Sequence, residues 1–186
     1  MSGKPIIFTV GHSTRLFAEL VDVVRAHGVR AIADVRIFPR SRRHPHFNDY
    51  ALARELPAQG LAYLPFKSLG GHRKPKPDSI NTAWRNASFR GYADYMQTPS
   101  FQSALDELMR AAREQPTTIM CAEAVPWRCH RSLIADALLV RGWDVQDIFD
   151  ARIAKPHKLP DFAMANGTMI EYRGQTEASE PSLFGP

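Results

Sequence analysis

Short apolar runs recur along the chain at intervals that suit buried strands. They occupy residues 6–10, 31–35, 61–65, 117–121 and 145–149, and three of them directly follow a glycine or a proline. Runs of this length between turn signals are typical of strands buried in a parallel sheet. The run 61–65 ends in a proline, which cannot donate to a neighbouring strand, so we expect it at a sheet edge or a strand end.

Between these runs, apolar residues recur at the spacing of a helix face. The clearest case begins after Thr98 and Pro99 and ends before Pro116, with apolar side chains at positions 101, 104, 105, 108, 109 and 112. Glycines and a capping asparagine mark the ends of three further segments. Helices are therefore also predicted from about residue 17 to Gly28, from Asn48 to about Gly60, and from about residue 133 to Gly142.

The predicted order of elements is βαβαβαβαβ, which favours an α/β fold. We expect a mostly parallel, open sheet of about five strands with helices on both faces, a Rossmann-like three-layer arrangement. This α/β domain is assigned to residues 1–150. Residues 151–186 contain Pro156, Pro160 and Pro181 and are expected to form an irregular C-terminal extension, loose after Gly174.

Length and composition are those of an ordinary globular protein, with 186 residues of which 44% are apolar. The chain has no apolar run near the roughly 20 residues of a membrane span, and its start lacks the long apolar stretch of a signal peptide. We expect a cytoplasmic protein without membrane contact. In that reducing compartment, the two cysteines are expected to be free thiols.

The net charge of +5 is modest but unevenly distributed. Between Arg36 and Arg90, eleven lysine and arginine residues face only three acidic ones, which gives +8, whereas the remainder of the chain carries −3. A local basic surface indicates an anionic partner, with nucleic acid or phosphorylated small molecules as the leading candidates. The same run of charge could also be a solvated loop face.

Polar and reactive side chains follow four of the predicted strands. The carboxyl ends of parallel strands meet at one edge of an open α/β sheet, where they form the ligand crevice with the amino ends of the helices. We therefore predict one shared site built from Gly11, His12 and Ser13, from Asp34 and Arg36, from Gly70 and Gly71, and from Cys121, Glu123, Cys129, His130 and Arg131.

Several blocks of sequence also resemble a known family. They are "TVGHS", "DVR" followed by "PRSRR", "YLPFKSLGG", "YADYM", and "CAE" followed by "P" and "CHR". In this order, from about Thr9 to Phe149, they resemble the bacterial domain-of-unknown-function family 488. The resemblance implies an α/β domain with a shared polar site and leaves the reaction open.

Cys129, Glu123 and His12 are the candidates for catalytic chemistry. Cys129 lies at the start of a predicted helix beside Arg128 and Arg131, so the helix dipole and the cationic neighbours are expected to lower its pKa. Glu123 suits a general base or an ion-pair partner of an arginine, and His12 suits proton transfer near neutral pH. A buried thiol, a structural ion pair and a loop histidine stay open as alternatives.

Cys121 and His130 are assigned supporting roles. Because Cys121 ends a buried strand, we expect it to react slowly. The C-x7-C-H arrangement of Cys121, Cys129 and His130, together with Glu123, could hold zinc, but it lacks the close C-x2-C pair of common zinc sites. We therefore assign no metal ligand and no cofactor from the sequence.

Arginines are the candidates for binding an anion. Asp34 and Arg36 are two residues apart on a strand, so their side chains share a face, and the carboxylate is expected to orient the guanidinium. A guanidinium group can hold a phosphate through two parallel hydrogen bonds. The residues expected to bind the anion are Ser13, Arg36, Arg40, Arg42 and Arg131.

Gly70 and Gly71 begin a segment that is expected to be a flexible basic loop. Aromatic residues follow it at positions 84, 89 and 92, and their rings could stack on bases or belong to the core. No G-x-G-x-x-G or G-x-x-x-x-G-K-[ST] motif follows a predicted strand, so dinucleotide and nucleoside triphosphate sites of the usual kind are not supported.

The function predicted from these features is that of an enzyme, a hydrolase or transferase, acting on a phosphate-bearing substrate such as a nucleotide or nucleic acid. Two alternatives remain. One is a non-catalytic nucleic-acid-binding module whose basic segment grips backbone phosphate. The other is a thiol redox or sensing protein, which requires Cys121 and Cys129 to approach each other in space.

Overall fold

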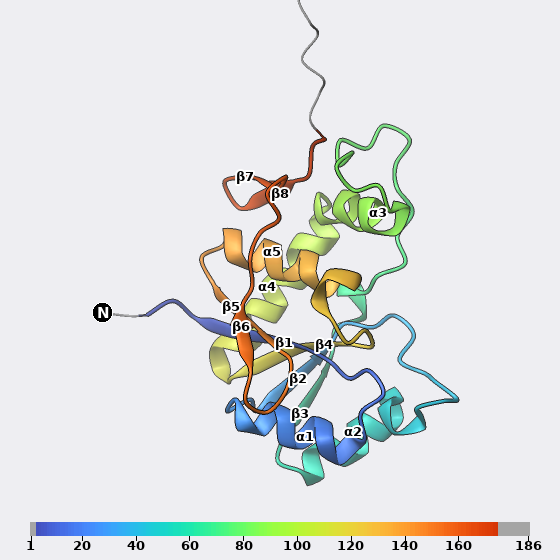
Figure 1. The fold of residues 1–186 in the computed structure, drawn as a ribbon, viewed down its shortest axis with the longest axis vertical. Coiled ribbons are helices and arrows are strands. Elements are labelled where there is room, and N and C mark those ends of the chain that lie inside the picture. The colour runs from blue at the N-terminus through green and yellow to red at the C-terminus, as the bar shows by residue number, and fades with distance from the viewer. Residues whose placement is uncertain (1–2, 175–186) are drawn as a thin grey trace, which may run out of the picture.

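Six strands form the central sheet of the structure, a computed structural model that describes residues 3–174 (Figure 1). Their order is β3-β2-β4-β1-β5-β6, and all neighbours are parallel except β5 and β6. This confirms the α/β fold with a mostly parallel sheet. The strands are β1 (Ile6–Gly11), β2 (Ala31–Asp34), β3 (Ala62–Pro65), β4 (Thr117–Cys121), β5 (Asp144–Ile148) and β6 (Ala154–Pro156).

Helices lie on both faces of the sheet, and each face has its own core (Figure 1). Successive side chains of a strand point to opposite faces, so the neighbours Ile119 and Met120 belong to different cores. The core that contains Ile119 is covered by α3 (Ala87–Met96), α4 (Pro99–Glu114) and α5 (Arg131–Val140), and the core that contains Met120 by α1 (Phe17–Ala26) and α2 (Asp49–Ala58).

The helix α4 is the one that the apolar spacing predicts most clearly. The side chain of Thr98 caps it by accepting a hydrogen bond from the N–H of Phe101, and Pro99 occupies its first turn. All six predicted apolar positions are buried, and the helix ends two residues before Pro116. With 16 residues it is the longest helix in residues 3–174, and none of the helices there is long and apolar enough to cross a bilayer.

The helix α3 lies in a segment where the sequence pattern predicts no helix. Asn86 caps it by accepting hydrogen bonds from two backbone N–H groups of the first turn. Asp94 is buried on this helix and accepts hydrogen bonds from the side chains of Ser79 and Asn81 at 2.6 and 2.8 Å. The helix therefore anchors the polar loop that precedes it.

Residues 151–174 are more regular than the sequence predicts. The strand β6 joins the central sheet, and β7 (Met164–Asn166) pairs with β8 (Met169–Glu171) in a hairpin that packs beside α5. The expectation of an irregular extension is wrong for this part, because strands of three residues are too short to show a periodic pattern. The loose tail expected after Gly174 lies outside the described residues.

Candidate functional site

The candidate site lies at the carboxyl ends of β1 and β4, which are neighbours in the sheet. The chain leaves β1 toward α1 on one face and leaves β4 toward α5 on the other, so the two connections diverge. Such a point in an open α/β sheet forms a crevice for ligands. The polar residues that follow these two strands in the sequence meet here.

Backbone hydrogen bonds join the two connections. The N–H of His12 donates to the carbonyl of Cys121 at 3.0 Å, and the next N–H donates to the next carbonyl at 2.9 Å. A Cβ atom at Gly11 would lie 1.8 Å from the carbonyl oxygen of Glu123, so only glycine leaves room for this close approach. The first polar residues after β1 are thereby fixed against those after β4.

Arg36 is buried, and its guanidinium is held from three sides. Its Nε and Nη2 atoms donate to the two carboxylate oxygens of Asp34 at 2.8 and 2.6 Å, as expected from the sequence. Nη2 also donates to the carbonyl of Phe47 at 2.8 Å, and Nη1 donates to Nε2 of His12 at 3.1 Å. Four of the five N–H donors are thus engaged, and one Nη1 hydrogen has no acceptor among residues 3–174.

His12 is a neutral hydrogen-bond acceptor in this site. Its Nδ1 contacts the carbonyl of Ser13 at 2.9 Å and must donate, so Nε2 is unprotonated and accepts from Arg36. Burial, and then the charge of Arg36, lower the pKa of His12 from 6.5 to about 4. The ring also stacks on Phe47 with centroids 4.2 Å apart. Because both ring nitrogens are engaged and its pKa is low, the geometry favours a positioning role for His12 over the proton transfer near neutral pH that the sequence suggests.

Arg131 is buried behind the loop that follows β4. It donates to the carbonyls of Glu123 and Ala124 at 2.6 and 3.0 Å, and its Nε has no partner among residues 3–174. No carboxylate within residues 3–174 pairs with it. Because the guanidinium is buried and its donors are directed at backbone carbonyls of the loop, the geometry does not support Arg131 as a ligand of the anion.

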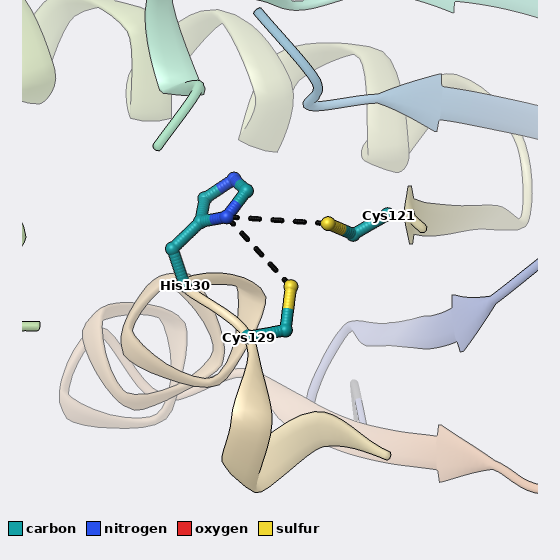
Figure 2. Close-up of side chains that lie close together, drawn as sticks. All are labelled: Cys121, Cys129 and His130. Carbon is teal, nitrogen blue, oxygen red and sulfur yellow. Dashed lines mark hydrogen bonds between the residues drawn. The ribbon is translucent and has the colours of Figure 1, made fainter. Parts of the chain in front are cut away.

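Two thiols and an imidazole converge at the base of the site (Figure 2). Nδ1 of His130 lies 3.7 Å from Sγ of Cys129 and 4.0 Å from Sγ of Cys121, and all three atoms lie within 4.8 Å of one another. Cys121 ends β4, and Cys129 and His130 directly precede α5. Nε2 of His130 donates to the carbonyl of Val35 at 3.0 Å, which leaves the lone pair of Nδ1 toward both sulfurs.

The two thiols have opposite pKa shifts. A hydrogen bond from Cys129 lowers the pKa of Cys121 well below its usual range, and the nearby His130 favours the same thiolate. Donating that hydrogen bond raises the pKa of Cys129, and burial adds to the effect. The sequence predicts the reverse, with a low pKa for Cys129. The difference arises because the contact between the sulfurs outweighs the field of Arg131, which the sequence pattern alone suggests would dominate.

Two adjoining cavities, of about 300 and 350 Å³, form what we call the crevice. Both are lined by Arg36, Phe38, Ala122 and Glu123. The larger is also lined by the first polar residues after β1, and the smaller by the cysteines. Other residues line only one of the two cavities, and these include His12, Ser13, Arg40, Gly71, His72, Cys121, Arg128, Cys129 and His130.

The remaining candidates differ in how close they come to this crevice. Glu123 is exposed at its rim, and Ser13 lines it. Arg40 lines it too, although its side chain is 78% exposed and lies 3.7 Å from Asp49. Arg42 is exposed and lines a separate hollow beside the crevice. Gly11, Asp34, Gly70, Arg42 and Arg131 line neither cavity, although Asp34 contacts Arg36 directly.

Gly70 and Gly71 are buried and pack closely. A Cβ atom at Gly70 would lie 2.1 Å from the side chain of Ile37, and one at Gly71 would lie 3.0 Å from Nδ1 of His130. These two glycines are therefore required for close approach, which corrects the expectation of a flexible loop beginning there. Tyr92, one of the possible stacking rings, is fully buried and donates to the carbonyl of Leu69 at 2.6 Å.

A second buried polar network was not anticipated from the sequence. His157 bridges two carboxylates, with Nδ1 2.8 Å from Asp147 and Nε2 2.9 Å from Asp136. Asp147 also accepts from Thr9, and Asp136 from Tyr172. The network ties the C-terminal segment to β1, β5 and α5. One signal for it was the acidic residue inside the apolar run at positions 133–140.

Comparison with known proteins identifies the family but no individual relative. Residues 17–138, about two thirds of the chain, match the sequence model of the family described as "Domain of unknown function DUF488". The matched range includes Arg36 and the cluster of Cys121, Cys129 and His130, but not His12. Neither the curated proteins nor the solved structures contain a match to the chain.

Proposed function

The chain belongs to the DUF488 family, and we propose that it is an enzyme acting on a phosphate-bearing substrate in the crevice. One observation carries this proposal. Arg36 is fixed by four hydrogen bonds, keeps one free N–H donor among the described residues, and lines both cavities of the crevice beside the cysteine and histidine cluster. A preoriented guanidinium beside reactive side chains is suited to hold an anion for chemistry.

The charge of the crevice supports an anionic substrate. Arg36, Arg40 and Arg128 line it, and Glu123 is the acidic residue that lines it among residues 3–174. Because Arg36 is largely withdrawn from solvent, a hydrogen bond from it to phosphate is screened less than one from a surface arginine. The arginines of the crevice therefore both attract the anionic substrate and orient its phosphate group.

The loops around the crevice favour a nucleotide or nucleic acid over a small inorganic anion. Residues 37–44 and 70–86 extend on the side of the molecule where the parallel strands end (Figure 1). Both loops are basic and expose arginine and lysine side chains. A strip of cations of this kind suits a substrate that carries phosphate beyond the reacting group.

Glu123 is the residue to which we assign proton transfer. Its carboxylate lies at the rim of both cavities, where it can reach a bound substrate or a water molecule. His12 instead positions Arg36, because its Nε2 accepts a hydrogen bond from that side chain. Cys121, Cys129 and His130 lie deeper and supply the remaining reactive atoms.

A thiol redox or sensing function is the second candidate. This function requires the two cysteines to approach each other in space, and the sulfurs of Cys121 and Cys129 lie within 4.8 Å of each other. A reversible disulfide between them needs no anion and no role for Arg36 or Glu123. The two functions therefore differ in which variants would abolish them.

Turnover is the test of the enzymatic function. The reduced protein is incubated, with and without added divalent metal, with nucleoside mono-, di- and triphosphates and with short single- and double-stranded oligonucleotides. Phosphorus NMR and gel electrophoresis report conversion. We expect at least one of these phosphate compounds to be converted. Glu123→Gln should slow this conversion by about a hundredfold or more while the compound still binds.

The control is Glu107→Gln, which changes an exposed glutamate on α4 that lines neither cavity of the crevice and should leave turnover unchanged. Tight binding of an oligonucleotide without conversion would instead favour the non-catalytic nucleic-acid-binding module. If no phosphate compound binds and a disulfide forms readily, the thiol function is favoured.

A further inference from the structure

We propose that Cys121, Cys129 and His130 form a zinc site whose fourth coordination position faces the crevice. The three ligand atoms are the sulfurs of the cysteines and Nδ1 of the histidine, all within 4.8 Å of one another (Figure 2). Thiolate and imidazole are the ligands that zinc takes most often in proteins. This revises the sequence-based assignment of no metal ligand, which relied on the absence of a C-x2-C pair.

The spacing of the three atoms suits a single tetrahedral ion. With Zn–S bonds of about 2.3 Å and a Zn–N bond of about 2.05 Å, a tetrahedral site separates sulfur from nitrogen by about 3.6 Å. The two observed sulfur–nitrogen distances are 3.7 and 4.0 Å. These two distances are close to those of a tetrahedral site, and the two sulfurs, which lie within 4.8 Å of each other, would need to be about 3.8 Å apart around the ion.

Neighbouring groups prepare the ligands for a cation. His130 donates its Nε2 hydrogen to the carbonyl of Val35 at 3.0 Å, so its Nδ1 carries a free lone pair and the ring orientation is fixed. The backbone N–H of Arg131 lies 3.5 Å from Sγ of Cys129 and can stabilise a thiolate there. These are the contacts that orient ligands in established metal sites.

Gly71 keeps the coordinating edge of the histidine clear. A Cβ atom at this position would lie 3.0 Å from Nδ1 of His130 and 3.3 Å from its Cγ. Nδ1 is the atom that would bind the metal, so even an alanine would crowd it. The close approach of backbone to this nitrogen is independent of the two sulfurs and points to the same three-ligand centre.

The position left open by three protein ligands is characteristic of catalytic zinc sites. All three ligands line the same cavity as Glu123 and Arg36, so a water molecule on the ion would meet a substrate held there. Resting on the proposed function, the reaction is hydrolysis. The oxygen of that water bonds to the electrophilic atom, Glu123 takes its proton, and the departing group leaves with its electron pair and receives that proton.

A disulfide is the competing use of the same sulfur atoms. It would need a bond of about 2.05 Å between them and would make no use of the histidine lone pair. The convergence of Nδ1 on both sulfurs, with Nε2 tied to a backbone carbonyl, is what a metal centre requires. The geometry therefore favours zinc over the disulfide.

Titration of the reduced, metal-free full chain with Co²⁺ and Zn²⁺ tests the site without any substrate. Cobalt replaces zinc in tetrahedral sites and gives intense visible absorption together with charge-transfer bands from thiolate ligands. We expect one equivalent of Co²⁺ to produce both features and one equivalent of Zn²⁺ to abolish them. Bound zinc should also protect both cysteines from alkylation.

Variants locate the ion. Cys121→Ser, Cys129→Ser and His130→Gln should each weaken metal binding by at least about tenfold, and the two serine variants should reduce the thiolate charge-transfer band. His72→Gln is the matched control, because its side chain lines the same cavity but offers no atom to the cluster. Circular dichroism confirms that each variant is folded.

Failure to bind an equivalent of either metal, or a cobalt spectrum without thiolate bands, would overturn the proposal. Rapid conversion of the reduced protein to a Cys121–Cys129 disulfide in the presence of Zn²⁺ would overturn it in favour of the thiol pair. Because these readouts need no phosphate, a loss of metal binding with intact phosphate binding rejects the zinc site alone. Metal binding without phosphate binding rejects the proposed function alone.

Discussion

Nε2 of His12 accepts a hydrogen bond from Nη1 of Arg36 at 3.1 Å, and this contact assigns a role to both side chains. The histidine must be neutral to accept, and the arginine keeps its charge while one more of its donors becomes fixed. Asp34 holds the opposite edge of the same guanidinium. Histidine often transfers protons in enzymes, but His12 here orients the guanidinium of Arg36.

This contact predicts a loss of stability in acid. The pKa of His12 is about 4 in the folded chain against 6.5 when unfolded, so between these values the unfolded chain binds more protons. The stabilisation is present above pH 6.5 and is lost as the pH falls to about 4, on the order of 3 kcal/mol in total. Urea unfolding across this range, compared with His12→Gln, measures it, and identical pH slopes for the two proteins would contradict the assignment.

His157 predicts the opposite behaviour in alkali. Burial opposes its charged form, but the hydrogen bonds and charges of Asp136 and Asp147 raise its pKa from 6.5 to about 9. The folded chain therefore binds more protons in this window, and the stabilisation is complete below pH 6.5 and lost as the pH rises through about 9. We expect a decline on the order of 2–3 kcal/mol in the free energy of unfolding, and a much flatter profile in His157→Gln. A wild-type profile without this decline would reject the charged histidine.

The fold was largely predictable because its longer elements carry clear apolar patterns. The six buried positions of α4 repeat at helical spacing, and the five parallel strands are short apolar runs. The helix α3 was missed because Gly91 and the buried Asp94 interrupt its apolar face. Gly91 lies against the backbone of Arg73, and Asp94 binds the preceding loop, so both depend on tertiary contacts that a local pattern does not contain.

The location of the site was predictable, but the direction of its side chains was not. Strand order and the ends of β1, β2 and β4 place His12, Arg36 and Cys121 at one edge. Whether a guanidinium faces the crevice or the loop behind it depends on packing, and Arg131 turns to the loop. Which thiol has the lower pKa depends on which sulfur donates the hydrogen bond to the other. That contact is visible only in the three-dimensional structure.

Gly71→Ala should disturb the metal site more than the fold. The added methyl would lie 3.0 Å from Nδ1 of His130, so the ring must shift by a few tenths of an ångström. We expect weaker Co²⁺ binding, by about tenfold, and a stability loss of about 1–3 kcal/mol. Gly3→Ala is the control, because nothing lies within 4 Å of its added Cβ atom. Equal cobalt affinity in the two alanine variants would show that Gly71 does not protect the ligand.

Calorimetric titration with a nucleoside monophosphate and with inorganic phosphate tests the central claim, that Arg36 holds an anion in the crevice. Arg36→Ala removes a fixed charge-assisted donor and should weaken binding by about 1.5–3 kcal/mol. Arg42→Ala removes an exposed charge that lies outside the crevice and should change binding by less than about 0.5 kcal/mol. Equal affinities of the wild type and Arg36→Ala for both ligands would contradict the account.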